Sequence, residues 1–294
     1  MCVTSPLERE FFNQPFKLSL DFSGISDCIK PHSKIYCKNI IMIIKMLHLI
    51  WLIPLGVLLG FVINHLADVL PNERKIFLKP YCTKCKQTFD LGNYITFRAC
   101  PNCDNPPGIR RLIVIIFMIL GISMSFYVPP QYPNAFFTII VIPYLMLVFV
   151  IDLEHRLILH PVTIAGIILF AIIGIFTNGI FQTFLGGASG FSIMFLLYLS
   201  GILFSRWMSK RRGEEIEEVA LGFGDVNLSL VLGLLLGWPK IAVNLLFAIL
   251  TGGIFSGFFI LYFILRKKYN AFTPIPYAPF LIISAIALIF LSAK

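Results

Sequence analysis

The sequence predicts an all-α polytopic membrane protein with about eight transmembrane helices and a small loop domain that contains four cysteines. Hydrophobic residues make up 57% of the 294 residues and charged residues only 13%, whereas a soluble domain carries about 25% charged residues. The apolar residues fall in runs of roughly 20, the length that an α-helix needs to cross a ~30 Å hydrocarbon core. Basic residues are concentrated in every second loop between those runs. These three observations together define the fold class.

The chain begins with a polar segment, 1–45, that lacks the basic, apolar and small-residue order of a signal peptide. This segment is either an unstructured tail or a stretch outside the native protein, with translation starting at Met42 or Met46. The first transmembrane helix is predicted at 46–66, and a long polar loop follows at 67–111. The membrane core then occupies 112–294, with predicted spans at 112–128, 135–151, 162–177, 180–204, 228–238, 241–265 and 277–291.

The distribution of lysine and arginine predicts the orientation of these helices. The loops 67–111, 152–161, 205–227 and 266–276 are basic, whereas 129–134 and 178–179 carry no charge and 239–240 has only Lys240. Because basic loops are retained in the cytoplasm, the four basic loops are predicted to be cytoplasmic. The same rule accounts for the net charge of +9 without nucleic acid as a partner.

Four of the seven cysteines form two CxxC pairs separated by 14 residues. Each pair directs two thiolates at one centre, and two pairs complete a tetrahedral site for zinc. The spacer, 86–99, contains the β-favouring residues 94–97 and suits the short hairpin of a zinc ribbon. Two disulfides or four unrelated thiols are the alternatives, although a reducing cytoplasm disfavours disulfides. The pattern predicts a structural zinc that folds this loop and is held by Cys82, Cys85, Cys100 and Cys103.

Two acidic residues stand at the ends of apolar runs on the same predicted face of the membrane. Asp152 ends one run, and Asp225 lies in the sequence Gly222-Phe223-Gly224-Asp225. An ionised group in the hydrocarbon core costs at least ~2.5 kcal/mol, so intramembrane acids are functional by default. Two carboxyl groups that share one proton supply a base that activates water and an acid that polarises a carbonyl, as peptide hydrolysis requires. Gly222 and Gly224 allow the close backbone approach that an extended substrate strand needs.

Taken together, these features resemble the bacterial type IV prepilin peptidases, the GxGD class of intramembrane aspartyl proteases. The resemblance runs from about Leu55 to the C-terminus and rests on Asp152 in VIDLEHRLILHPVT, the GFGD sequence and the double CxxC loop. The segment 60–64, GFVIN, is similar to the family's Gly-Ser-Phe-Leu-Asn. The segment 275–280, IPYAPF, is similar to its Ile-Pro-Phe-Gly-Pro-Phe.

The resemblance implies that 112–294 is an aspartyl protease core in which Asp152 and Asp225 are the catalytic pair and Gly222 and Gly224 form the active-site loop. Such an enzyme would cut the short basic leader of prepilins and pseudopilins after a glycine. The cut would be made at the cytoplasmic side of the bacterial inner membrane. Many members of the family also methylate the new N-terminus with S-adenosylmethionine.

The sequence departs from the family pattern in three places. Asn227 stands where GxGDxK has its lysine, and 158–160 reads Ile-Leu-His where Ile-Pro-Asp is usual. Downstream of Cys103, the segment 106–111 lacks the tyrosine and the acid of the Arg-Tyr-Pro stretch associated with methylation. Both acids and both glycines are retained, so we expect proteolysis to be intact, and the use of S-adenosylmethionine stays open.

Two other functions compete with proteolysis. A proton-coupled transporter could use the two aspartates as relay groups, but relay acids lie near the bilayer midplane, and Asp152 and Asp225 lie at predicted helix ends. A zinc-ribbon membrane scaffold would leave the aspartates unexplained. Glu154, next to Asp152, is interpreted as part of a water-facing turn. The glycines along 186–201 and 252–257 are interpreted as helix-packing positions.

Overall fold

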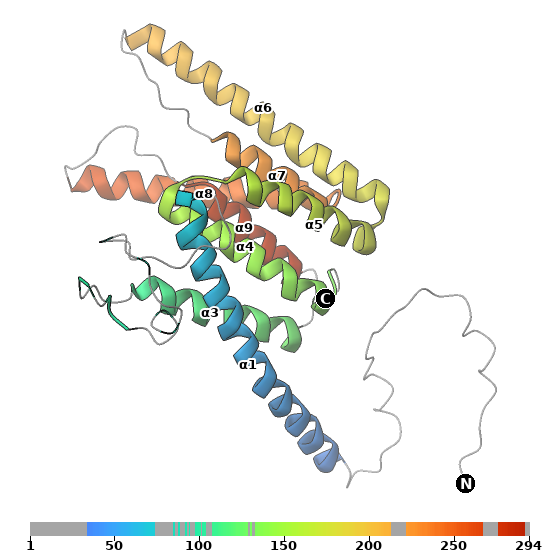
Figure 1. Cartoon of the computed structure of the whole chain (residues 1–294). Helices are drawn as coiled ribbons and strands as arrows, with labels where there is room; N and C mark the ends of the chain where they lie inside the picture. Colours follow the sequence, from blue (N-terminus) through green and yellow to red (C-terminus); the bar gives the residue numbers. More distant parts are fainter. Residues whose placement is uncertain are drawn as a thin grey trace, which may run out of the picture. The chain divides into compact units, whose positions relative to one another are not determined.

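The structure is a computed structural model that describes residues 34–73, 98–100, 108–128, 133–212, 222–266 and 276–291, together with residues 85, 88, 92, 94, 102, 103 and 130. Side chains of the first range are described from residue 50 to residue 71. The regular elements of the described part of the chain are all helices (Figure 1), with Thr88 in an isolated β-bridge, which confirms the predicted fold class. Its elements are α1 (Lys34–Glu73), α3 (Ile109–Tyr127), α4 (Ala135–His155), α5 (His160–Asn178), α6 (Ile180–Arg212), α7 (Phe223–Leu236), α8 (Lys240–Leu265) and α9 (Ala278–Leu291).

The chain divides into two compact units, 1–49 and 50–294. In the first unit, residues 34–49 form the beginning of α1, which starts twelve residues before the predicted 46–66 span. The apolar residues 40–44 explain the earlier start, because they extend the helical run. The remainder of the predicted tail, 1–33, lies outside the described residues. In the second unit α1 continues to Glu73, beyond the predicted end, because Ala67, Val69 and Leu70 are buried and extend its packed face.

Six of the helices are long and apolar enough to cross a membrane, namely α3, α4, α5, α6, α8 and the part of α1 from Ile50 to Pro71. The other two, α7 and α9, are shorter apolar helices. The 14 residues of α7 extend over about 21 Å, less than the ~30 Å of a hydrocarbon core. Ten of those 14 residues are buried, so α7 is enclosed by other helices.

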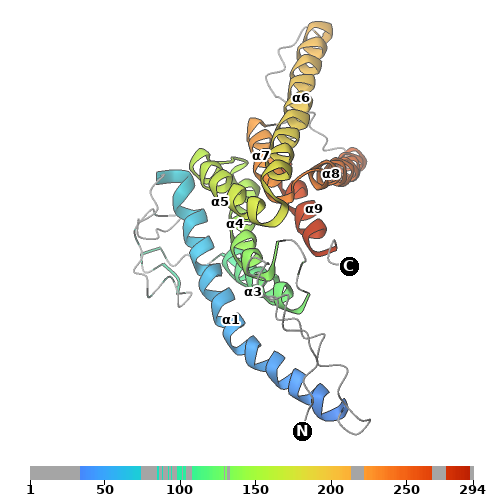
Figure 2. The same ribbon diagram turned by 90° about the vertical axis from the view of Figure 1, so that its right-hand side faces the viewer.

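Close packing between α6 and α7 depends on glycines, as the sequence predicts for part of the set. A side chain at Gly186 or Gly233 would overlap the backbone of the other helix, and one at Gly190 would meet the carbonyl oxygen of Ser229 at 2.6 Å. The two helices accordingly lie side by side in Figures 1 and 2. Gly201, Gly253 and Gly257 have no such neighbour among the described residues, so the packing interpretation is wrong for these three.

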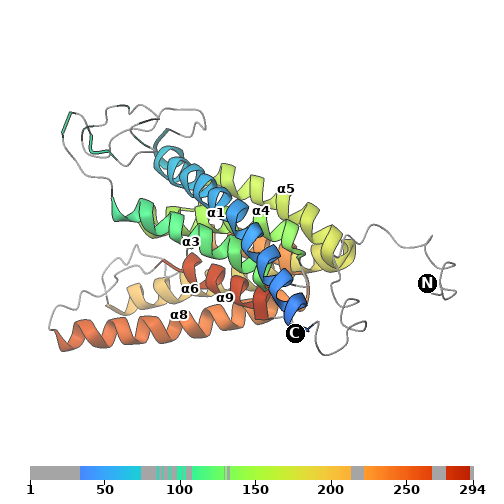
Figure 3. The same cartoon turned by 90° about the horizontal axis from the view of Figure 1, so that it is seen from below.

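Helices α5 and α9 position the two aspartates because each packs against both α4 and α7. In Figure 3, α3 runs beside α4, and α8 runs beside α9. A third contact involves α1, where Gly60 faces Ile115 of α3 at a spacing that leaves no room for a side chain. The result is a bundle in which α5 and α9 each connect α4 with α7.

Candidate active site and cysteine cluster

Asp152 lies in the last turn of α4. Its residue surface is only 5% exposed, and its Oδ2 atom is buried without a hydrogen-bond partner among the described residues. The helix ends three residues later, where Arg156 adopts a left-handed conformation and its backbone N–H donates to the carbonyl oxygen of Asp152 at 2.8 Å. The carboxylate thus points into the bundle from a helix end and not from the middle of a span.

Asp225 lies in the first turn of α7, where Gly222 is the N-cap residue. The Asp225 side chain accepts a hydrogen bond from the backbone N–H of Gly222, and the Asp225 N–H donates to the Gly222 carbonyl at 3.1 Å. This is the acidic half of a capping box, and the positive end of the helix dipole also favours an anion there. The local sequence therefore fixes a buried carboxylate, 8% exposed, at the start of a buried helix.

The two carboxylates interact electrostatically, although they are 73 residues apart in the sequence. Gly224 allows the start of α7 to lie against the loop after α4, because a side chain there would meet Cβ of Ile158 in that loop at 3.0 Å. No ion pair involves either acid within the described residues. The positive charge of Arg156 interacts with Asp152 without forming an ion pair.

Tyr277 is a further polar side chain near the pair. It directly precedes α9 and interacts electrostatically with Asp225. Its hydroxyl is buried and has no hydrogen-bond partner among the described residues. Gly252 of α8 provides space for the ring, because a side chain at that position would meet Tyr277 at 3.1 Å.

Three of the four predicted zinc ligands are brought together. The sulfur atoms of Cys85, Cys100 and Cys103 all lie within 4.8 Å of one another, and those of Cys85 and Cys100 are 3.6 Å apart. Thiolates that share a tetrahedral zinc are about 3.8 Å apart, so the arrangement fits a metal centre. Cys82 lies outside the described residues.

Within the spacer between the cysteine pairs Thr88 lies in a β-bridge, but the backbone of Tyr94 is helical, so the expected hairpin is wrong at Tyr94. Tertiary contacts override its β propensity, because the ring is buried and the hydroxyl donates to Asp68 at 3.0 Å. The neighbouring residues 95–97 lie outside the described part of the chain.

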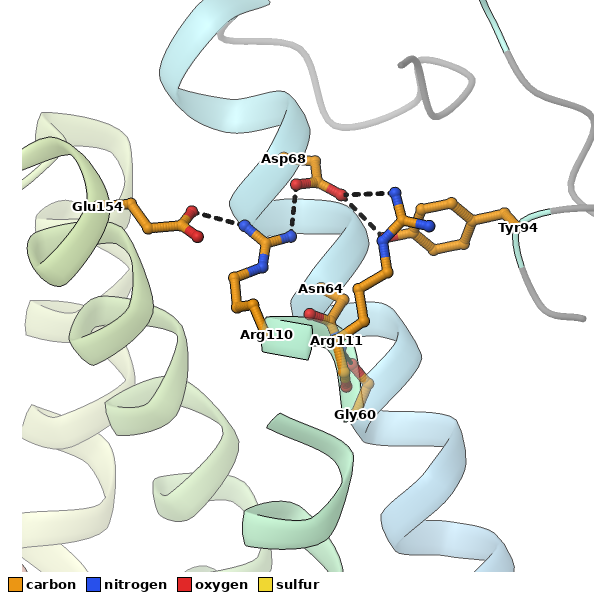
Figure 4. Close-up of polar contacts among 7 residues, drawn as sticks. All are labelled: Gly60, Asn64, Asp68, Tyr94, Arg110, Arg111 and Glu154. Carbon is orange, nitrogen blue, oxygen red and sulfur yellow. Dashed lines mark hydrogen bonds and ion pairs between the residues drawn. The ribbon is translucent and has the colours of Figure 1, made fainter. Parts of the chain in front are cut away.

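Sequence reasoning missed a cluster of charged residues around Asp68, near the C-terminal end of α1 (Figure 4). Asp68 forms ion pairs with Arg110 and Arg111, and Arg110 also pairs with Glu154 of α4. The position of Asp68 within the predicted loop 67–111 concealed its burial. A usable signal was the apolar sequence around it, Ala67-Asp68-Val69-Leu70, which continues the first helix.

Fold and site thus define a class: a polytopic helical membrane protein with two buried, electrostatically interacting aspartates at helix ends and a cysteine cluster suited to a metal. The sequence model of the type IV leader peptidase family matches residues 139–257. That region contains both aspartates and both glycines of the GFGD sequence, so the candidate site lies within the segment that matches the family.

Two curated relatives extend the similarity. A prepilin leader peptidase/N-methyltransferase of Aeromonas hydrophila is 26% identical over 189 residues, which cover 63% of this chain and 59% of that protein. One of Legionella pneumophila is 26% identical over 266 residues, covering 81% of this chain and 88% of that protein. No solved structure matches. The match spans less than two thirds of the length of the Aeromonas protein. The family match and the two relatives together confirm the resemblance to aspartic-type prepilin peptidases.

Proposed function

We propose that this chain is a membrane-embedded aspartic endopeptidase that removes the leader peptide of type IV prepilins or pseudopilins, with Asp152 and Asp225 as its catalytic pair. The observation that carries the proposal is that two buried carboxylates interact electrostatically and have no ion-paired cation among the described residues. The family match over 139–257 and the names of both relatives support it.

The chemistry follows from the placement of two acids in a medium of low dielectric constant. Close carboxylates cannot both ionise there, so the pair holds one proton between them. The ionised group takes a proton from an attacking water, while the protonated group donates to the carbonyl oxygen of the scissile peptide. Each acid has support for its ionised form: the backbone N–H of Gly222 and the α7 dipole act on Asp225, and the positive charge of Arg156 acts on Asp152. Either acid can therefore serve as the base while the other serves as the acid.

Substrate recognition is proposed to occur at the cytoplasmic face of the inner membrane, where the basic loops are expected. Gly222 is exposed beside the aspartate, and its backbone can pair with an extended substrate segment. Prepilins of this type present a short basic leader on that side. Both relatives are named as peptidases, so the transporter alternative receives no support from them.

The metal of the cysteine cluster is proposed to be zinc, held by Cys82, Cys85, Cys100 and Cys103. All four positions would be filled by thiolates, so the metal would stabilise the loop and take no part in hydrolysis. Purified protein is expected to contain about one zinc per chain. Cys100→Ser should lower that content, whereas Cys37→Ser, outside the CxxC pairs, should not. Equal zinc content in the two variants would rule out the four-cysteine site.

The peptidase proposal is tested by co-expressing the full chain with a type IV prepilin and scoring the loss of the leader on a gel. Asp152→Asn and Asp225→Asn keep the size of the side chain but remove the shared proton, so each should reduce cleavage by at least ~10²-fold. Both variants should reach the membrane in normal amounts. Normal cleavage by either variant would refute the pair.

The same assay examines the second activity in the relatives' names, N-methylation. Mass spectrometry of the mature substrate reads it directly, because a methylated N-terminus carries the added mass of one methyl group. S-adenosylmethionine would be the methyl donor, and its omission from a purified reaction should abolish that mass shift without affecting cleavage.

A further inference from the structure

Arg110 connects three helices at the end of the bundle that carries Asp152. It lies at the start of α3, and its two terminal nitrogens bond different acids (Figure 4). Nη2 donates to Oδ1 of Asp68 on α1, and Nη1 donates to Oε2 of Glu154 on α4, both at 2.5 Å. A guanidinium with two carboxylates in this forked geometry is held in one orientation.

Asp68, the inner partner, is itself fixed from several directions. Its side chain is 5% exposed, and its Oδ2 accepts a hydrogen bond from Tyr94 and lies 3.8 Å from the Arg111 guanidinium. Arg111 in turn stacks on the Tyr94 ring, 4.2 Å from its centroid. Asn64 donates to the Arg111 carbonyl at 3.2 Å and so joins α1 to α3. Arg110 is therefore held at its Asp68 end by a connected group of residues, and its other end binds Glu154 of α4.

Glu154, the outer partner, follows Asp152 by two residues on the last turn of α4. Two residues correspond to about 200° around an α-helix, so the two acids project from nearly opposite faces. Arg110 binds Glu154 on one face of this turn, whereas Asp152 projects from the opposite face. The terminal turn of a helix frays readily, because its last carbonyl groups lack intrahelical partners. A bond to Glu154 resists both fraying and rotation about the helix axis.

We propose that Arg110 is a positioning residue for the catalytic pair, holding the last turn of α4 through Glu154 so that Asp152 stays directed at Asp225. The inference rests on the proposed peptidase function, and it assigns Arg110 no contact with the substrate or the reacting water. In this proposal the residues around Asp68 form the structural support on which the active site is positioned. A displacement of about 1 Å at a catalytic group can reduce a rate by ~10²-fold, so a loosened turn would lower turnover.

The test uses the purified full-length chain and a purified type IV prepilin. Arg110→Gln and Glu154→Gln each remove the charge pair, and each should lower kcat by about 10- to 100-fold with little change in KM. The double variant should be no slower than the slower single variant, because both remove the same connection. Arg110→Lys keeps a charge that can reach one acid and should recover part of kcat.

Controls separate positioning from general stability. Arg266→Gln removes an exposed arginine at the end of α8 and should leave kcat unchanged. Metal content and the thermal unfolding midpoint are measured for every variant. If Arg110→Gln fails to accumulate, Glu154→Gln alone tests the positioning role. That variant is expected to fold, because Arg110 keeps its ion pair with the buried Asp68.

Wild-type kcat in Glu154→Gln would overturn the positioning role, as would multiplicative losses in the double variant. A loss of kcat that follows metal content or unfolding in parallel would also overturn it, because it would show that Arg110 only supports the fold. If the wild-type chain leaves the prepilin uncut, the proposed function is wrong and the positioning role falls with it. If the wild type cuts and both glutamine variants match it, only the positioning role is wrong.

Discussion

Asp68 and the Asp152–Asp225 pair are both buried, yet their surroundings are opposite. Asp68 has two arginines and a tyrosine hydroxyl around its carboxylate. The pair has no ion-paired cation among the described residues, and Oδ2 of Asp152 has no hydrogen-bond partner there. A buried charge with partners is the usual arrangement in a folded protein, whereas one without them is costly.

The difference separates two uses of a buried acid. The charge of Asp68 is compensated, so it contributes a fixed connection between α1, α3 and the loop that carries Tyr94. Neither acid of the pair has an ion pair within the described residues, and under the proposed mechanism the two carboxyl groups share a proton that is available for transfer. A buried acid whose charge is compensated suits a structural role, whereas a buried acid without an ion-pair partner suits catalysis. The variants below test this division, in order of expected effect.

The largest effect on stability is expected from Asp68→Asn. The substitution leaves Arg110 and Arg111 without their buried counter-charge, which typically costs about 3–5 kcal/mol in the free energy of unfolding. Unfolding in mixed micelles measures the change. Asp152→Asn is the matched control, because removing one of two repelling acids should cost less than about 1 kcal/mol or increase stability. Equal losses of unfolding free energy in the two variants would contradict the distinction between a structural Asp68 and a catalytic pair.

A smaller effect, on activity, is expected from Gly224→Ala. The added methyl group would meet Ile158 at 3.0 Å and move the start of α7 away from the end of α4, lowering kcat by up to ~10²-fold. Gly222→Ala is the control, because its nearest neighbour would be Oδ2 of Asp225 at 3.6 Å, an ordinary contact distance. Its φ of −77° also suits alanine. A prepilin cleavage assay should show the smaller loss in Gly222→Ala, and the reverse order would refute this role of Gly224.

Tyr94→Phe should cost about 1 kcal/mol of unfolding free energy, because it removes the hydrogen bond to Asp68. Burial raises the pKa of the Tyr94 hydroxyl, and the Asp68 carboxylate raises it further. A pKa above the unfolded value of about 10 means that the stabilisation is complete below that pH and is lost as the pH rises further. The difference between wild type and variant should therefore be constant from about pH 6 to pH 9, and a difference that shrinks within that range would contradict the assignment.

The smallest effect is expected from Tyr277→Phe. The hydroxyl is buried without a partner among the described residues, so its removal should change the unfolding free energy by less than about 1 kcal/mol. Cleavage should also change little, since the proposed mechanism needs only the two aspartates. A large loss of kcat with normal stability would show that the pair is incomplete without this hydroxyl.

Much of the fold could be predicted because lipid imposes a simple rule on the sequence. A helix satisfies its backbone groups within a single segment inside a membrane, so long apolar runs mark helices directly. The runs at 112–128, 135–151 and 241–265 correspond to α3, α4 and α8. The rule is less informative at helix ends, where burial continues past the apolar run, as at α1. It also cannot distinguish a spanning helix from an enclosed short one such as α7.

The candidate site could be predicted where a residue type is rare in its sequence context. Asp152 and Asp225 stand out because acids are rare at the ends of apolar runs, and the cysteines stand out by spacing. The cluster around Asp68 did not stand out, because Arg110 and Arg111 resemble ordinary loop charges. Glu154 likewise reads as a water-facing residue until α3 is placed beside α4.

The amino-acid sequence by itself determined the helical membrane class, the positions of two improbable acids and the pairing of four cysteines, because hydropathy and spacing are local properties. Only the tertiary structure decided that Asp152 lies close enough to act electrostatically on Asp225 and that Arg110 joins Asp68 to Glu154. Those partners are 73, 42 and 44 residues apart in the chain. Such contacts depend on which helix faces which, and that is set by glycine-dependent packing and by the joint satisfaction of buried charges.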